Sequence, residues 1–368
     1  MALPRLFLLL ALPLFVFSCS SDKDDPDVEV VPDNKPTPYT LQIPATLPKS
    51  FIIPEDNPLT VEGVALGRHL FYEAKLSRNN TMSCGSCHQQ PLAFTDGKGL
   101  STGISRQQTK RGSMSLANML WFNQFNWDGS ATSLEEQALK PLEDPLEMHQ
   151  PVAEAVNKLQ QTELYPPMFE KAFGSPTITK ENMLKALAQF QRTLISGNSR
   201  YDRYLQNKEV FTPDEVEGMA LFMTHPDPST NTRGGNCGDC HGGVLLTTRT
   251  FHNNGLDFEP KDNGLGDITG KATDKGKFKS PSLRNIALTA PYMHDGRFKT
   301  LEEVLDHYNE HIRFNTPNLD PLITEASNMP NGRSLGLTSE EKRKIIAFLH
   351  TLTDTTFIKD KRFSDPFR

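Results

Sequence analysis

The sequence of 368 residues lacks several features that mark common classes of protein. Its 39 lysines and arginines do not outnumber its 45 aspartates and glutamates, so a basic surface for nucleic acid is not expected. No stretch alternates apolar and polar residues for long enough to predict a sheet. The 27 prolines and 24 glycines are too many for a coiled coil or a solenoid. Short helices joined by ordered loops are therefore expected, and the length suits two domains.

Long hydrophobic runs are also missing, except at the N-terminus. Residues 6–17 are apolar but too few to span a membrane as a mature helix. Ser18 precedes Cys19, which resembles the lipobox of bacterial lipoproteins, where the cysteine is acylated. We predict a lipoprotein signal peptide over residues 1–18, a lipid on Cys19, and a flexible acidic and proline-rich tether over residues 19–45. An ordinary signal peptide is the alternative, and both readings place the folded part in the periplasm or cell envelope.

An internal duplication organises the rest of the chain. Residues 67–71 and 218–222 are similar, and each segment precedes a Cys-x-x-Cys-His motif. The second copy begins with a capping box at residues 212–215. Each copy also ends in a predicted helix that carries Phe-x-x-Thr-Leu. We therefore predict two homologous helical domains, over residues 46–207 and 208–368.

The two motifs account for the remaining four cysteines, so no thiol is left for a disulfide. The spacing lets two thioethers hold one edge of a porphyrin while the adjacent histidine reaches the iron, which is typical of c-type haem. Zinc ribbons place their cysteine pairs about 12 to 20 residues apart, much closer than these pairs lie. A redox dithiol would not require the two histidines. We expect two covalent haems, held by Cys84, Cys87, His88, Cys237, Cys240 and His241.

Nine further stretches carry a family resemblance that spans residues 43–353. They are Asn57-Pro-Leu-Thr60, Leu66-Gly-Arg68, Leu76-Ser-Arg78, Trp127-Asp-Gly129, Leu134-Glu-Glu-Gln137, Pro145-Leu-Glu-Met148, Arg200-Tyr-Asp-Arg203, Pro281-Ser-Leu-Arg-Asn285 and Ala290-Pro-Tyr-Met-His-Asp-Gly296. In these stretches the chain resembles the bacterial di-haem cytochrome c peroxidases, the family that includes MauG. The resemblance implies an all-α fold of two cytochrome c-like domains in tandem. It also implies that peroxide reacts at the N-terminal haem and that electrons enter at the C-terminal one.

The resemblance assigns roles to residues near the first haem. Glu147 matches the family's distal glutamate, which moves a proton between the two oxygens of peroxide. Gln137 matches an amide that orients water or peroxide beside that glutamate. Pro141 matches a proline over the haem, and we also expect it to end a helix over residues 133–140. Trp127 matches a tryptophan through which electrons pass between the haems.

The distal ligand of the second iron is expected on a helix that begins near Thr300. Position 308 lies on the apolar face of this helix by the i, i+3, i+4, i+7 rule. Many family peroxidases offer a methionine from this helix, whereas Tyr308 resembles the ligand of MauG. Tyr308 is our predicted ligand, and His307, His311 and Met293 are the alternatives.

The resemblance further implies a calcium ion between the domains. Backbone carbonyls at positions matching Thr289 and Pro291 would bind it, together with an asparagine side chain. Gly112 stands at the asparagine position here, so that ligand is lost. His294 matches the family sequence but is expected to be structural.

Two absences bear on function. Many peroxidases of the family that this chain resembles block the first iron with a histidine from the loop after the first haem motif. Residues 89–126 contain no histidine, so the resemblance implies that the first iron is open even when oxidised. The expected activity is reduction of hydrogen peroxide with electrons from a small c-type cytochrome or a copper protein of the cupredoxin type. The alternative is a MauG-like oxidase of a partner protein, although residues 234–236 lack the surface tryptophan that MauG uses. A third reading, a non-enzymatic electron-transfer cytochrome, would require a closed first iron.

Overall fold

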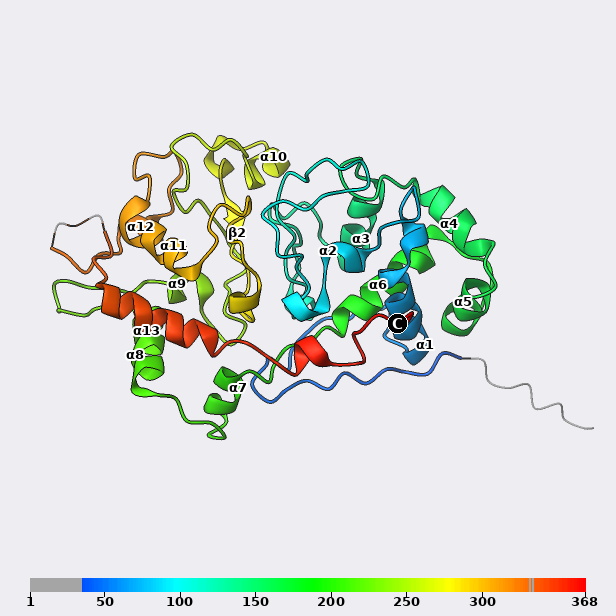
Figure 1. The fold of residues 1–368 in the computed structure, drawn as a ribbon, viewed down its shortest axis with the longest axis horizontal. Coiled ribbons are helices and arrows are strands. Elements are labelled where there is room, and N and C mark those ends of the chain that lie inside the picture. Colours follow the sequence, from blue (N-terminus) through cyan, green and yellow to red (C-terminus); the bar gives the residue numbers. More distant parts are fainter. Residues whose placement is uncertain (1–34, 331, 333) are drawn as a thin grey trace, which may run out of the picture. The chain divides into compact units, whose positions relative to one another are not determined.

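The computed structural model describes residues 35–330, 332 and 334–368, and helices dominate this part (Figure 1). The α-helices are α1 (Val61–Tyr72), α2 (Cys84–Cys87), α3 (Leu134–Glu143), α4 (Val152–Gln160), α5 (Tyr165–Phe173), α6 (Lys180–Arg192), α7 (Arg200–Leu205), α8 (Pro213–Met223), α9 (Gly238–His241), α10 (Leu265–Thr269), α11 (Leu301–Asp306), α12 (Pro321–Thr324) and α13 (Ser339–His350). A π-helical turn, His307–His311, continues α11. Short 3₁₀ turns lie at Ala74–Leu76, Gln90–Leu92, Met119–Trp121, Ala272–Asp274, Ile286–Leu288 and Phe357–Lys359.

Sheet structure is scarce within the described residues. Strands β1 (Phe251–His252) and β2 (Phe278–Lys279) pair antiparallel, with Phe251 opposite Lys279. The expectation of a helical fold is therefore confirmed, apart from this two-residue pair.

Two pairs of helices build two apolar cores in the same way. Helix α1 packs on α6 in the first core, and α8 packs on α13 in the second (Figure 1). Gly67 and Gly218 allow this close approach, because a β-carbon at either position would overlap a backbone carbonyl of the partner helix. Capping boxes begin α8 and α13, which confirms the one predicted at residues 212–215.

Aromatic rings repeat the same arrangement in both cores. The ring centroids of Phe71 and Phe190 lie 5.3 Å apart in the first core, and those of Phe222 and Phe348 lie 5.3 Å apart in the second. These four residues occupy matching positions in the duplicated segments of the sequence. The repeat in the sequence is therefore accompanied by a repeat in packing.

The C-terminal tail returns to the first core. Phe357 and Phe363 belong to that core, and the ring of Phe357 lies 5.5 Å from that of Phe94. The buried side-chain amide of Gln90 donates to the carbonyls of Phe357 and Asp360 at 3.1 and 2.8 Å. The residues after α13 thus complete the first core, although the sequence assigns them to the C-terminal domain.

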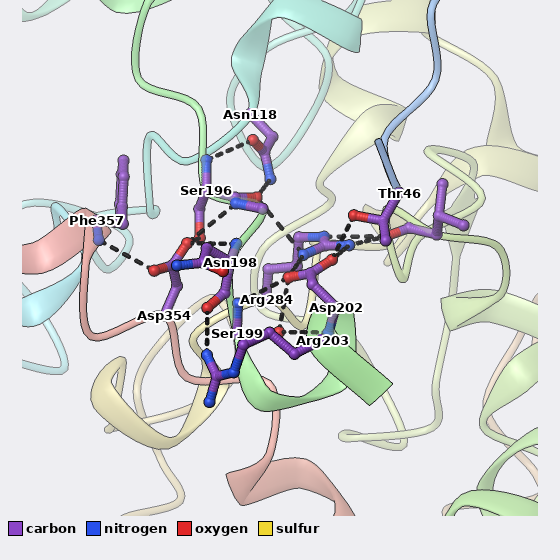
Figure 2. Close-up of polar contacts among 12 residues, drawn as sticks. Thr46, Asn118, Ser196, Asn198, Ser199, Asp202, Arg203, Arg284, Asp354 and Phe357 are labelled. Atoms are coloured by element: carbon purple, nitrogen blue, oxygen red, sulfur yellow. Dashed lines mark hydrogen bonds and ion pairs between the residues drawn. The ribbon is translucent and has the colours of Figure 1, made fainter. Parts of the chain in front are cut away.

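A buried polar network joins the segment after α6 to the second half of the chain (Figure 2). The guanidinium of Arg284 donates to both carboxylate oxygens of Asp202, at 2.8 and 3.0 Å. Ser196 and Asn118 exchange two hydrogen bonds, from the Ser196 backbone N–H at 2.9 Å and from the Asn118 amide at 3.0 Å. The Ser196 hydroxyl also donates to Asp354 at 3.1 Å. Because these buried groups satisfy one another, they hold the chain between α6 and α7 in place.

The described chain begins inside the predicted tether. The backbone N–H and hydroxyl of Thr37 donate to the carboxylate of Glu62 at 2.8 and 2.9 Å. The N–H of Tyr39 donates to the carbonyl of Leu59 at 2.9 Å. The C-terminal end of the tether predicted over residues 19–45 is therefore packed, because it is hydrogen-bonded to the start of α1.

The predicted signal peptide and Cys19 lie outside the described residues. Across residues 35–368, as far as they are described, no helix has the length and apolar character needed to cross a bilayer.

Candidate functional site

Helix α2 presents the first Cys-x-x-Cys-His motif. Cys84 and Cys87 lie one turn apart at its two ends, and His88 follows as the C-cap residue. The Nδ1 atom of His88 lies 2.8 Å from the carbonyl of Phe94 and 3.2 Å from the hydroxyl of Ser113. A proton on Nδ1 serves the carbonyl and leaves Nε2 with a free lone pair. Burial lowers the pKa of His88, which favours this neutral ring.

The second motif repeats this geometry at α9. Cys237 precedes the helix, and Cys240 and His241 lie within it. The Nδ1 atom of His241 lies 3.1 Å from the carbonyl of Pro281 and 3.3 Å from the hydroxyl of Ser280. Burial lowers the pKa of His241 to about 4, so this ring too is neutral and offers Nε2 to a metal.

The four cysteines suit covalent haem attachment. None of the four forms a disulfide, and burial is the main cause that raises the pKa of each, to about 12 for Cys84, Cys237 and Cys240. Such buried thiols do not ionise near neutral pH. A thioether carries no charge at any pH, so this burial fits sulfur atoms bonded to a porphyrin.

A cavity of about 250 Å³ adjoins the second motif. Apolar residues that line it include Phe222, Leu283, Ile286, Leu301, Val304, Leu305 and Leu349. Tyr308 and Met293 line this cavity, whereas His307 and His311 lie outside its lining. The structure therefore brings two of the four ligand candidates to the second site.

Tyr308 lies in the π-helical turn, and its side chain is partly buried against the second apolar core. Its hydroxyl accepts a hydrogen bond of 3.0 Å from the side-chain amide of Asn254. The same amide nitrogen lies 3.5 Å from Sδ of Met293. Burial raises the pKa of Tyr308, so the phenol is neutral unless a cation approaches its oxygen.

Glu147, Gln137 and Pro141 meet beside the first motif. All three line a small cavity of about 40 Å³ with Cys84, Cys87 and His88. The same three residues also line a larger cleft of about 940 Å³ that extends to Trp127. The structure thus gathers the residues that the sequence placed over the first haem.

The Glu147 carboxyl group is mostly buried. Burial, with the negative charge of Asp144, raises its pKa to about 7. In residues 35–368, as far as they are described, no hydrogen-bond donor contacts this carboxyl group. The Glu147 backbone is fixed, because its N–H donates to the Asp144 carbonyl and its carbonyl accepts from the Ile104 N–H, each at 3.0 Å. Glu147 can therefore exchange a proton with a molecule bound in the cavity.

Pro141 does not end its helix, which corrects the expectation of a helix over residues 133–140. Helix α3 continues to Glu143 with Pro141 inside it. Proline has no N–H, so the carbonyl of Gln137 loses its helical partner, yet the helix resumes for a further turn. The N–H of Asp144 donates to the carbonyl of Lys140 at 3.0 Å and closes that turn.

Trp127 lines both the second cavity and the larger cleft, so it lies in the wall between the two sites. Its indole N–H donates to the carbonyl of Gly112 at 2.9 Å, and its own carbonyl accepts from the N–H of Lys279 at 2.8 Å. Trp121 instead belongs to an apolar cluster and donates to the carbonyl of Pro48 at 3.1 Å.

The calcium residues of the sequence analysis, Gly112, Thr289 and Pro291, all line the second cavity. The N–H of Gly112 donates to the carbonyl of His294 at 2.8 Å. A β-carbon at Gly112 would lie 2.7 Å from the carbonyl oxygen of Gly99, so a larger residue would have to displace the backbone at Gly99. In the part of the chain that the structure describes, no three His, Cys, Asp or Glu side chains gather as a metal site.

Two residues of these sites carried no sequence signal. Asn254 contacts Tyr308 across 54 positions of the chain. Lys279 is buried between the two sites, donates to the carbonyl of Gln124 at 2.9 Å, and has its pKa lowered by burial to about 8. Both were missed because each owes its place to long-range packing, and no local motif marks either one.

Comparisons with known proteins agree with this geometry. Residues 61–210 match the protein family described as "Di-haem cytochrome c peroxidase". MauG of Methylorubrum extorquens is 36% identical over 313 residues, which cover 83% of this chain and 82% of that protein. Cytochrome c551 peroxidase of Nitrosomonas europaea is 32% identical over 304 residues, which cover 80% of this chain and 81% of that protein.

A solved structure of a MauG-like protein associated with microbial copper homeostasis is 38% identical to the chain. It superposes with a TM-score of 0.80 and covers 90% of this chain and 100% of its own. From these matches the chain belongs to the di-haem cytochrome c peroxidase family, whose members are oxidoreductases with two c-type haems.

Proposed function

We propose that the chain forms two cytochrome c-like domains in tandem, residues 46–207 and 208–368, with the C-terminal tail packed on the core of the first. We further propose that the chain reduces hydrogen peroxide to water at the first haem. The observation that carries this proposal is the position of Glu147. Its buried carboxyl group shares one cavity with His88 and Gln137 and is free of hydrogen-bond donors from the described residues. When bound, the haem supplies the iron through which electrons reach the peroxide.

Glu147 would move the proton that peroxide cleavage requires. Reduction of one hydrogen peroxide consumes two electrons and two protons and gives two waters. Glu147 takes a proton from one peroxide oxygen and returns it to the other, so that water rather than hydroxide leaves as the O–O bond breaks. A carboxyl group with a pKa of about 7 suits both steps near neutral pH. The amide of Gln137, in the same cavity, would orient the peroxide.

Electrons would enter at the second haem and cross to the first through Trp127. His88 and His241 would bind the two irons through Nε2, and Tyr308 would be the distal ligand of the second. Trp127 supports this path because it lines both sites. The donor would be a small c-type cytochrome or a cupredoxin.

A second function, peroxide-dependent oxidation of a partner protein, is favoured by one observation. Tyr308 lines the second cavity, and a tyrosine ligand resembles MauG more than the peroxidases. Residues 234–236 still lack the tryptophan of the MauG route, so peroxide reduction remains the first proposal.

Three expectations from the sequence are part of the proposal. A lipid on Cys19 would hold the enzyme on a bacterial membrane, in the periplasm or cell envelope. A calcium ion would bind the carbonyls of Thr289 and Pro291 beside the second cavity. Because Gly112 has no side-chain oxygen to replace the asparagine ligand, this site would be weak.

Spectra of the oxidised holoprotein test the assignment. One high-spin and one low-spin haem are expected, since the first iron would have an open position and the second would be closed by Tyr308. Two low-spin haems would contradict an open first iron in the oxidised protein, because no position for peroxide would be free in that state.

A further inference from the structure

Asn254 contacts both side chains that compete for the second iron. Its Nδ2 atom donates to the Tyr308 hydroxyl at 3.0 Å and lies 3.5 Å from Sδ of Met293. All three residues line the cavity beside His241. The Asn254 amide therefore contacts both candidates for the distal ligand of the second iron.

The backbone around Asn254 is held by the loop that follows the π-helical turn. The side-chain amide of Asn253 donates to the carbonyl of Pro317 at 2.9 Å, and its oxygen accepts from the N–H of Gly255 at 3.0 Å. The N–H of Arg313 donates to the carbonyl of Gly255 at 2.9 Å. The hydrogen bonds of Asn253 and Gly255 thus fix the backbone on both sides of Asn254.

The π-helical turn is anchored to the same residue. The Nε2 atom of His307 lies 3.0 Å from the backbone carbonyl of Asn254. A backbone carbonyl can only accept a hydrogen bond, so the ring donates to it through Nε2–H. Asn254 therefore holds two successive residues of the turn, His307 by its carbonyl and Tyr308 by its side chain. Such turns shift the direction of the side chains that follow and are frequent at functional sites.

We propose that Asn254 is a positioning residue that selects Tyr308 over Met293 as the distal ligand of the second haem. This inference rests on the proposed ligand role of Tyr308. The Nδ2 group can only donate hydrogen bonds, and a phenolate oxygen bound to iron still accepts one. Hydrogen bonds to an anionic oxygen are about twice as strong as neutral ones, whereas thioether sulfur is a weak acceptor. The amide thus stabilises the tyrosine-bound arrangement more than the methionine-bound one.

The test compares Asn254→Asp with Asn253→Asp in the holoprotein. Each variant removes one amide donor from the same segment, but only the first removes the donor that serves Tyr308. The readouts are the tyrosinate-to-iron absorption band and the midpoint potential of the second haem. We expect Asn254→Asp to lose more than half of the band and to raise the potential, as Met293 binds. Asn253→Asp should keep both values.

The rise in potential identifies the new ligand, because a hard carboxylate would keep the potential low and the soft thioether raises it. Asn254→Leu is the second variant, with the same expected changes and no carboxylate. Adding Met293→Leu to it should abolish the rise. Retention of the band in either Asn254 variant, or its equal loss in Asn253→Asp, overturns the proposal. Tyr308→Phe distinguishes failure of the positioning role of Asn254 from failure of the proposed ligand role of Tyr308. An unchanged spectrum in Tyr308→Phe would reject the tyrosine ligand itself.

Discussion

Arg284 and Asp202, 82 residues apart in the sequence, form an ion pair that solvent does not reach. Two hydrogen bonds of 2.8 and 3.0 Å join them, and the hydroxyl groups of Ser199 and Thr46 donate to the same carboxylate at 2.7 and 2.8 Å. Arg284 also donates to the carbonyl of Val244, just after the second haem motif, at 2.9 Å. The pair therefore connects the segment between the two cores to the second site (Figure 2).

Replacing Asp202 by asparagine should destabilise the protein strongly. The change leaves the Arg284 charge buried without its partner, which costs about 3 to 5 kcal/mol in the free energy of unfolding. Denaturant unfolding of the holoprotein measures this. The control is Asp214→Asn, which breaks an exposed pair with Arg343 and should have a much smaller effect. Equal losses in the two variants would contradict the role of the buried pair.

The same pair predicts a loss of stability in acid. Burial raises the pKa of Asp202, but its hydrogen bonds and the charge of Arg284 outweigh burial, and the pKa lies below its usual range. The carboxylate therefore stabilises the fold fully above its unfolded pKa of about 3.9. This contribution is lost as the pH falls through the lower folded pKa. Unfolding curves from pH 6 downward should converge for the native protein and Asp202→Asn, and a constant difference would contradict the assignment.

Local signals predicted much of this architecture. The haem motifs, the capping box at residues 212–215 and the duplicated helices depend on neighbours in the sequence, and the structure contains them all. Glu147 and Gln137 line the cavity beside the first haem motif, where the family motif implies that they lie. Pro141 misled the prediction of the helix end, because the loss of one N–H was too small an effect to stop α3.

Features set by distant packing could not be read from the sequence. The Asn254–Tyr308 contact spans 54 residues, and the contacts of Gln90 with the C-terminal tail span about 270. The residues next to Asn254 or Gln90 in the sequence do not predict which distant residue either side chain contacts. The packing of the last residues of the predicted tether had no local signal either, since Thr37 donates to Glu62, which belongs to a helix that begins later in the chain.

Glu147→Gln should keep both haems and slow the reaction with peroxide by roughly 10² to 10⁴, the usual contribution of a positioned acid–base group. Glutamine has the same size but cannot take up the proton. Among the described residues that line the small cavity, Glu147 has the one carboxyl group. Stopped-flow mixing with peroxide measures the rate. Glu143→Gln, on the last turn of α3 and outside both cavity linings at the first site, is the matched control.

The rate of the peroxide reaction should also depend on pH through Glu147. Its pKa is raised to about 7 by burial and by Asp144, and the carboxyl must be ionised to accept a proton from peroxide. The rate should therefore rise as the pH increases through about 7 and level off above it. Asp144→Asn removes the neighbouring charge, so the midpoint should move to lower pH. A midpoint that is the same in the native protein, Asp144→Asn and Glu147→Gln would assign the profile to another group.

The fully oxidised enzyme should react with peroxide without prior reduction. Many family peroxidases block the first iron with a histidine from the loop after the haem motif, but residues 89–126 contain none. Within the described residues that line the small cavity, His88 is the one histidine, and it serves as the proximal ligand of the proposal. The loop is also fixed: the N–H of Ile104 donates to the Glu147 carbonyl at 3.0 Å, and a β-carbon at Gly103 would overlap the carbonyl of Leu146. Stopped-flow traces of the fully oxidised and one-electron-reduced protein should therefore both start without delay. A lag that pre-reduction abolishes would show that another side chain closes the first iron.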